Sequence, residues 1–136
     1  MNESLNISPE EFQELELKPL GQFIELEHGT PACESLRDAI CATPNQDEEK
    51  IIAYLENGFI TAVAACTVRD VLSESEKSIC GLYGQTDLVW HWYSDLAYYV
   101  KTYHVQLPEA FIQHIKSKNW MMGEVPEKYK LESSQD

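Results

Sequence analysis

The sequence has few basic residues and no long apolar run. Of its 136 residues, 10 are Lys or Arg and 23 are Asp or Glu, which gives a net charge of −13. Nucleic acids and anionic membrane surfaces are bound through clustered basic side chains, so we expect neither as a partner. No stretch approaches the roughly 18 to 20 apolar residues that span a bilayer. The first residues also lack the basic and apolar regions of a signal peptide, so we expect a cytoplasmic protein.

Cysteine and histidine are too scattered to form a recognisable metal motif. The four cysteines, Cys33, Cys41, Cys66 and Cys80, include no Cys-x-x-Cys pair, and the four histidines stand singly. Structural zinc sites need four such ligands in close groups, so we expect no metal. The phosphate-binding glycine motifs are absent too, and we expect no other cofactor. Without a secretion signal, the apolar neighbours of the cysteines favour reduced, mostly buried thiols.

Acidic residues are concentrated in the first 56 residues, which hold 13 acidic and 3 basic side chains. A strongly acidic surface attracts basic proteins and speeds their association. This favours a non-catalytic acidic binding protein that neutralises or escorts a basic protein partner, as toxin-immunity proteins do. The candidate charged contacts are Glu48, Glu49 and Glu56, which share one predicted helix.

Length and composition indicate one folded domain. At 43% hydrophobic residues the chain can bury a core of its own. We expect a flexible N-terminus over 1–8, a single α+β domain over 9–122 and a flexible tail over 123–136. The fold class predicted is a small mixed sheet of three to five short strands, with three to four helices packed on it.

Hydrophobic periodicity and capping residues locate the elements. Alternating or continuous apolar runs predict strands over 23–27, 59–66, 79–83 and 88–93. The second of these is apolar on both faces, which favours a central, doubly covered strand. In the last, Trp90 and Trp92 share one face, and His91 and Tyr93 the other. Helices are expected over 32–42, over 44–56 after a Thr43 cap, from Ser94 to 103, and over 108–118.

The aromatic run over 87–104 contains the candidate catalytic and binding residues. His91 and Asp95 stand four residues apart, and a carboxylate there could orient an imidazole for base catalysis. The alternative is that Asp95 serves the start of the following helix. Trp92, Tyr93 and Tyr98 belong either to the core or to a binding surface, because Trp and Tyr dominate interface hot spots. Two other functions therefore remain open: a small enzyme with a pocket around His91 and Asp95, and a homo-oligomeric structural module.

The stretch from Asp87 to Val100, followed by residues 103–108, resembles a family of small bacterial proteins of unknown function. The family shares the core motif Asp-Gly-x-Trp-x-Trp-Pro-x-Asp-Leu-x-Tyr-Tyr-Val. Leu88 stands where the motif has glycine, and Tyr93 where it has proline, so the turn geometry could differ. The resemblance takes in most of residues 23–120. It implies one compact domain and no particular activity.

Overall fold

The protein folds as one mixed sheet with helices. The computed structural model describes residues 4–26 and 34–129. Within these ranges the sheet has four strands in the order β1-β4-β3-β2, with β1 parallel to β4 and the other neighbours antiparallel. The α+β class and the mixed sheet are confirmed. The strands are β1 (Lys18–Pro19), β2 (Phe59–Arg69), β3 (Ser78–Thr86) and β4 (Trp90–Tyr93).

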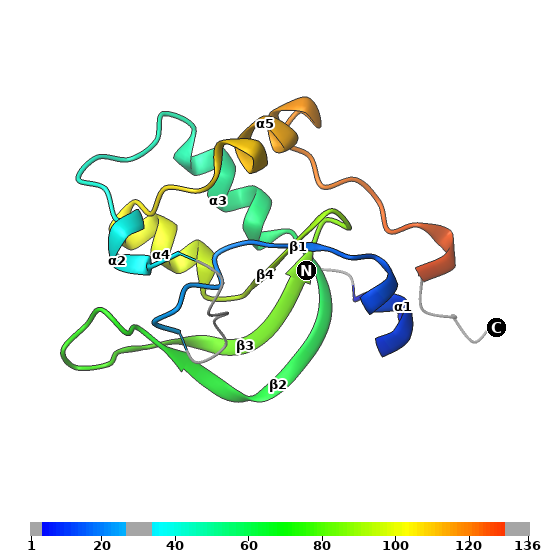
Figure 1. Cartoon of the computed structure of the whole chain (residues 1–136), viewed down its shortest axis with the longest axis horizontal. Helices are drawn as coiled ribbons and strands as arrows, with labels where there is room; N and C mark the ends of the chain where they lie inside the picture. Colours follow the sequence, from blue (N-terminus) through cyan, green and yellow to red (C-terminus); the bar gives the residue numbers. More distant parts are fainter. Residues whose placement is uncertain (1–3, 27–33, 130–136) are drawn as a thin grey trace.

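Five α-helices accompany the sheet in the described ranges. Helices α3, α4 and α5 lie over one side of the sheet, and the paired strands β2 and β3 curve away beneath them (Figure 1). None of the described helices is long and apolar enough to cross a membrane. The helices are α1 (Pro9–Glu14), α2 (Leu36–Ala39), α3 (Glu48–Glu56), α4 (Leu96–Tyr103) and α5 (Glu109–Ser117), and a short 3₁₀-helix, η1 (Glu127–Tyr129), follows.

The main core lies between β4 and these helices. Trp90 and Trp92 of β4 are buried there, whereas His91 and Tyr93 point to the other face of the sheet. The predicted alternation along this strand is therefore confirmed, and Trp92 belongs to the core rather than to a binding surface. The helical residues that complete the core are Leu36 and Ala39 of α2, Ile51, Tyr54 and Leu55 of α3, Leu96, Tyr99 and Val100 of α4, and Phe111, Ile112 and Ile115 of α5.

β2 is an edge strand, although the sequence predicts a central one. Only β3 pairs along it, and residues 62–67 are all exposed. Val63 keeps 74% of its surface accessible. The run of small apolar residues predicts a strand that is covered on both faces. Such coverage depends on where the helices pack, and here they pack over β4.

The prediction of a strand over 23–27 is wrong for residues 23–26, the part of this range that the structure describes. Phe23 and Leu26 are buried, but residues 24–26 form a turn and a bend rather than a strand. The Glu25 carboxylate turns toward α2, where it accepts hydrogen bonds from Ser35 Oγ at 2.5 Å and from the Leu36 amide at 2.7 Å. Burial raises the pKa of Glu25, but these bonds offset it and lower the pKa to about 2. Glu25 is thus the cap of α2.

Two helices, α3 and α4, also begin differently from the prediction. α3 begins at Glu48, four residues later than predicted, because Asn45 Oδ1 accepts the Asp47 amide and holds a turn before the helix. α4 begins after Asp95, and Ser94 does not cap it. The Ser94 hydroxyl donates to Gly81 O at 2.7 Å and accepts from the Tyr83 amide, so it joins this turn to β3.

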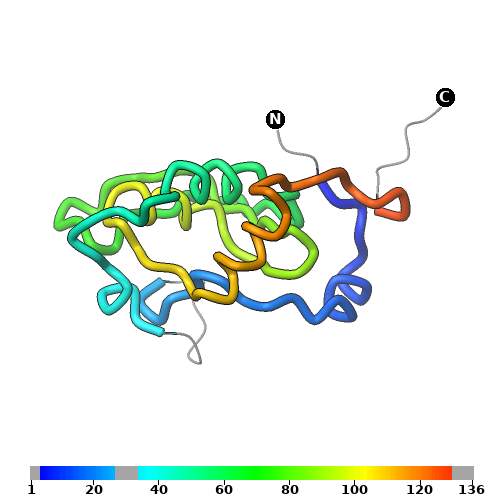
Figure 2. Tube along the Cα trace, turned by 90° about the horizontal axis from the view of Figure 1, so that it is seen from above, coloured from blue at the N-terminus to red at the C-terminus, as the bar shows by residue number. Residues whose placement is uncertain are grey.

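The folded region is wider than the predicted limits of 9 and 122. Leu5, Phe59, Val125 and Tyr129 form a second, smaller buried cluster. The Leu5 amide donates to Ile60 O, and the Asn6 amide donates to Tyr129 O. The N-terminal segment and the segment around η1 accordingly lie side by side in both views (Figures 1 and 2).

The described cysteines are free thiols, but they are not buried. Cys66 is exposed on β2, and Cys41 and Cys80 are half-buried. The expectation of mostly buried thiols is therefore wrong for these three, and Cys66 is exposed because β2 lies at the edge and not at the centre. Cys33 lies outside the described residues.

Candidate functional site

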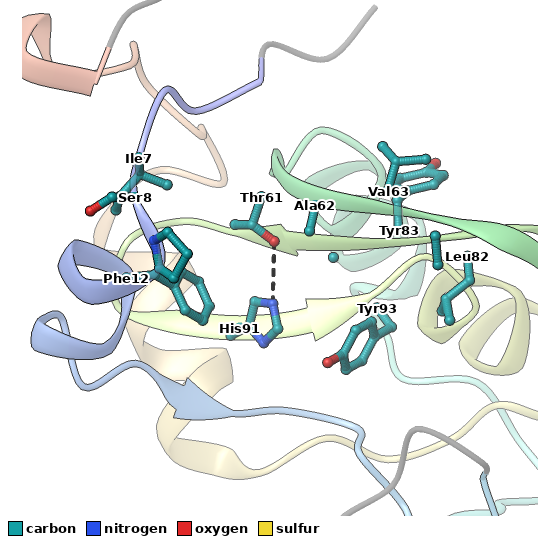
Figure 3. A pocket seen from close by; sticks show the side chains of 13 residues that line it. Ile7, Ser8, Phe12, Thr61, Ala62, Val63, Leu82, Tyr83, His91 and Tyr93 are labelled. Carbon is teal, nitrogen blue, oxygen red and sulfur yellow. Dashed lines mark hydrogen bonds between the residues drawn. The ribbon is translucent and has the colours of Figure 1, made fainter.

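A cavity of about 350 Å³ opens on the face of the sheet opposite the main core. It lies between α1 and strands β2, β3 and β4 (Figure 3). Phe12 and Tyr93 form aromatic walls, and the rings of both pack edge-on against His91, at 5.2 and 5.1 Å between centroids. The lining is mostly apolar, and its polar side-chain atoms come from residues that include His91, Thr61, Ser8 and Tyr93.

Helix α1 supplies one wall of the cavity, and the sequence prediction missed it. Ser8 caps the helix: its hydroxyl accepts from the Glu11 amide, the Glu11 carboxylate accepts from the Ser8 amide, and Pro9 follows at the first helical position. This capping box was visible in the sequence as Ser8-Pro9-Glu10-Glu11. It fixes the turn that places Phe12 over His91.

Gly84 makes room for the polar part of the cavity. It lies in β3 between Ala62 of β2 and Tyr93 of β4. A Cβ atom at this position would lie 2.4 Å from Thr61 Oγ1 and 2.9 Å from His91 Nε2. Only glycine therefore lets these two side chains approach each other across the sheet.

We expect Gly84→Ala to destabilise the fold by about 1 to 3 kcal/mol, the usual range for overpacking. The added methyl group would also separate Thr61 from His91. Chemical denaturation would measure the first effect, and a shift of the His91 ring resonances in NMR spectra the second. Gly81→Ala is the matched control in the same strand, because a Cβ there would meet only Cys66 O at 4.0 Å. Equal stability of the two variants would contradict the close packing at Gly84.

His91 is neutral at pH 7, because burial lowers its pKa to about 4. Its Nδ1 lies 3.4 Å from Gln22 Nε2, and its Nε2 lies 3.5 Å from Thr61 Oγ1. The Gln22 amide nitrogen can only donate, so Nδ1 accepts and Nε2 carries the proton. Both contacts are long and hence weak hydrogen bonds.

His91 and Asp95 do not share a cavity. Asp95 is 1% exposed at the start of α4 and lines a different cavity with Thr67 and Arg69. The partners of the His91 ring nitrogens are Gln22 and Thr61 instead. The four-residue spacing suggested an imidazole oriented by a carboxylate, but the chain turns between β4 and α4 and separates the two side chains. The geometry therefore gives no His–Asp catalytic pair.

The other candidate residues have different environments. Glu48 is half-buried, with Oε2 2.8 Å from His104 Nδ1, so it stabilises the contact between α3 and the end of α4. Glu49 and Glu56 are exposed. Tyr98 is half-buried, and its hydroxyl donates to the Asp70 carboxylate at 2.6 Å. Of the predicted aromatic binding residues, Tyr93 is the one that lines the cavity around His91.

A second polar cluster surrounds Asp87 and is structural. Oδ2 of this buried carboxylate accepts from the Tyr54 hydroxyl at 2.6 Å and lies 2.8 Å from His114 Nε2. Oδ1 accepts the amides of Val89 and Trp90. The cluster joins the β3–β4 turn to α3 and α5. Within that turn Leu88 has φ 76°, a left-handed conformation that glycine adopts at lower cost.

Neither a metal centre among the described residues nor a match in the comparisons with known proteins is found. Among the residues that the structure describes, no group of three or more His, Cys, Asp or Glu side chains is placed to hold a metal ion. Comparison with protein-family models, with curated proteins and with solved structures finds no match to the chain.

Proposed function

We propose that this protein is a non-catalytic binding protein, and that it holds a basic protein partner by adding a strand of that partner to the outer edge of β2. The observation that carries the proposal is the exposure of residues 62–67 at this edge. Neutralising or escorting the partner, as toxin-immunity proteins do, is the role we infer for such binding.

The outer edge of β2 pairs with no further strand over residues 62–67 among the described residues, and its pairing with β3 shifts register between Val63 and Thr67. Among the described residues, the N-terminal segment meets this edge only at Ile60, through Ser4 and Leu5. Residues 62–67 read Ala-Val-Ala-Ala-Cys-Thr and include neither a charge nor a proline. Proteins usually protect their sheet edges with such residues, because an open edge pairs with other chains. An extended segment of a partner would gain backbone hydrogen bonds here.

The surrounding charge favours a basic partner. Exposed acidic side chains stand at both ends of the β2–β3 ribbon: Glu56 just before β2, and Glu74 in the loop that follows it. Glu10, Glu11 and Glu14 of α1 add further exposed acid on the side of the cavity. A second copy of the chain is disfavoured as the occupant, since each copy carries a net charge of −13 and the two would repel.

The test uses Val63→Lys, with Val63→Thr as its matched control. Both changes fall on a side chain that is 74% exposed, so the fold should survive them. The lysine brings to the edge a positive charge that repels a basic partner, whereas threonine keeps a β-branched neutral side chain. A partner captured from the native lysate and then purified is expected to bind Val63→Lys at least about tenfold more weakly and Val63→Thr almost normally.

Two further measurements complete this test. In the complex, the amides of residues 62–67 should exchange more slowly with solvent, and the double reversal Glu56→Lys with Glu74→Lys should flatten the salt dependence of association. Unchanged exchange at 62–67, or equal affinity of the two Val63 variants, would rule out the β2 edge as the interface. A free protein that is dimeric, and that Val63→Lys makes monomeric, would replace the basic partner with a second copy.

A further inference from the structure

We infer that the cavity around His91 is a binding site for a small uncharged molecule with an aromatic body and a carbonyl oxygen, which the Thr61 hydroxyl and the His91 ring recognise. This ligand is distinct from the partner proposed for the β2 edge. The inference does not depend on that partner.

The size and lining of the cavity define the body of the ligand. A volume of about 350 Å³ lies at the small end of the range for small-molecule sites, and it suits a two-ring molecule. None of the described residues that line it is Asp, Glu, Lys or Arg. A charged ligand would lose its hydration without gaining an ionic partner, so an uncharged ligand is favoured. Phe12 and Tyr93 offer ring faces and edges for aromatic contacts (Figure 3).

A chain of hydrogen bonds determines which polar group the ligand carries. Gln22 Nε2 donates to His91 Nδ1, and His91 Nε2–H then donates to Thr61 Oγ1. The Thr61 hydroxyl, having accepted this bond, keeps its own hydrogen to donate. The His91–Thr61 contact is 3.5 Å long, so an oxygen atom of a ligand competes well for both donors. The ligand therefore needs an acceptor, and a carbonyl oxygen supplies one.

The test uses prodan, an uncharged naphthalene that carries a propionyl carbonyl and whose emission shifts when that carbonyl accepts a hydrogen bond. Saturable binding to the wild-type protein is expected, with the emission of a hydrogen-bonded carbonyl. Thr61→Val should weaken binding about tenfold and shift the emission to the blue, because it removes the donor and keeps the side-chain shape. Thr61→Ser, which restores a hydroxyl, should recover most of the affinity.

A pair of control variants tests where prodan binds, and two control probes test whether the carbonyl and the lack of charge determine binding. Ala64 lines the cavity and its neighbour Ala65 does not, although both are exposed on β2. Ala64→Glu should therefore weaken prodan binding at least about tenfold, whereas Ala65→Glu should leave it within about twofold. 2-Dimethylaminonaphthalene, which lacks the carbonyl, should bind wild type and Thr61→Val equally. 8-Anilinonaphthalene-1-sulfonate should bind much more weakly than prodan.

Several results would overturn the inference. Absence of saturable prodan binding would exclude the site, and so would equal losses for Ala64→Glu and Ala65→Glu. Equal affinity of Thr61→Val and wild type for prodan would exclude the recognition of the carbonyl. Circular dichroism confirms that each variant is folded, and the two alanine positions decide the question even if Thr61→Val does not fold.

Discussion

Replacing Trp92 with Ala is expected to lower the free energy of unfolding by about 3 to 5 kcal/mol, the range for removing a large aromatic side chain from a core. Trp92 is 0% exposed. Its indole packs near Tyr54 and Phe111, with ring centroids 6.3 and 5.9 Å away, and its Nε1–H donates to Leu55 O at 3.1 Å. The substitution would leave a cavity and would remove one of the hydrogen bonds that Leu55 O accepts, although the Gly58 amide still donates to it.

The close packing of Gly58 against Trp92 also supports a large loss of stability in Trp92→Ala. A Cβ at that position would lie 2.6 Å from Trp92 Cζ2, so the chain between α3 and β2 is shaped to the indole. Chemical denaturation measures the change. Val63→Ala is the control on the exposed edge of the same sheet, and it should cost almost nothing. If the two variants were equally stable, Trp92 would not be part of the core.

Replacing Asp70 with Ala is expected to cost about 3 to 5 kcal/mol, because three hydrogen bonds to a buried carboxylate that anchors the β2–β3 loop to α4 are lost together. Asp70 is 1% exposed. Its Oδ2 accepts from the hydroxyls of Tyr98 and Tyr103, each at 2.6 Å, and its Oδ1 accepts from the Leu72 amide at 2.8 Å. Without the carboxylate these donors lose their partner. Tyr98→Phe and Tyr103→Phe each remove one bond to a charged group and should cost about 1.5 to 3 kcal/mol.

The pH dependence of unfolding tests the same cluster in two ranges. Burial raises the pKa of Asp70, but the hydrogen bonds from Tyr103, Tyr98 and the loop amides offset it and hold the pKa below the usual aspartate value of 3.8. The stability due to Asp70 is therefore present above that value and is lost as the pH falls below it. Hydrogen bonding to Asp70, with burial, raises the pKa of Tyr103 to about 12 from 10.0. Its contribution is present below pH 10 and is lost as the pH rises toward 12.

The measurement is chemical denaturation at a series of pH values, with Tyr103→Phe as the control for the alkaline range and Asp70→Asn for the acidic one. Each control should reduce the pH dependence of its own range by the contribution of the group that it removes, while other groups such as Glu25 and Tyr98 continue to contribute. An Asp70→Ala variant as stable as the wild type would show that the loop is not held by this carboxylate.

Local patterns predicted the elements that pack against the core. In α4, Leu96, Tyr99 and Val100 recur with helical spacing, and all three are buried as expected. The alternation along β4 likewise predicted the faces of Trp90 and His91. These predictions succeed because each depends on which side of one element is apolar, and neighbouring residues encode that directly.

The cavity was predicted only in part. One alternative from the sequence was a pocket around His91 and Asp95, and His91 is among the residues that line the cavity. Asp95 was one candidate for the partner of His91, with a role at the start of the next helix as the alternative, but Thr61 and Gln22 lie beside the ring instead. Thr61 is 30 residues away along the chain and Gln22 is 69 away, so no local spacing could have indicated either. Gly84 gave no signal by itself, because its role is to leave space between two other strands.

The amino-acid sequence by itself determined the class of the fold, the acidic surface and the inward and outward faces of β4 and α4. Composition and short-range periodicity carry this information, and both are independent of how the strands are ordered. Only the tertiary structure decided that β2 is an edge strand, that Trp92 is core, and that His91 meets Thr61 rather than Asp95. Strand order and helix coverage follow from contacts between distant segments, where the total buried apolar surface decides. In this chain the larger buried cluster includes Trp90 and Trp92 of β4.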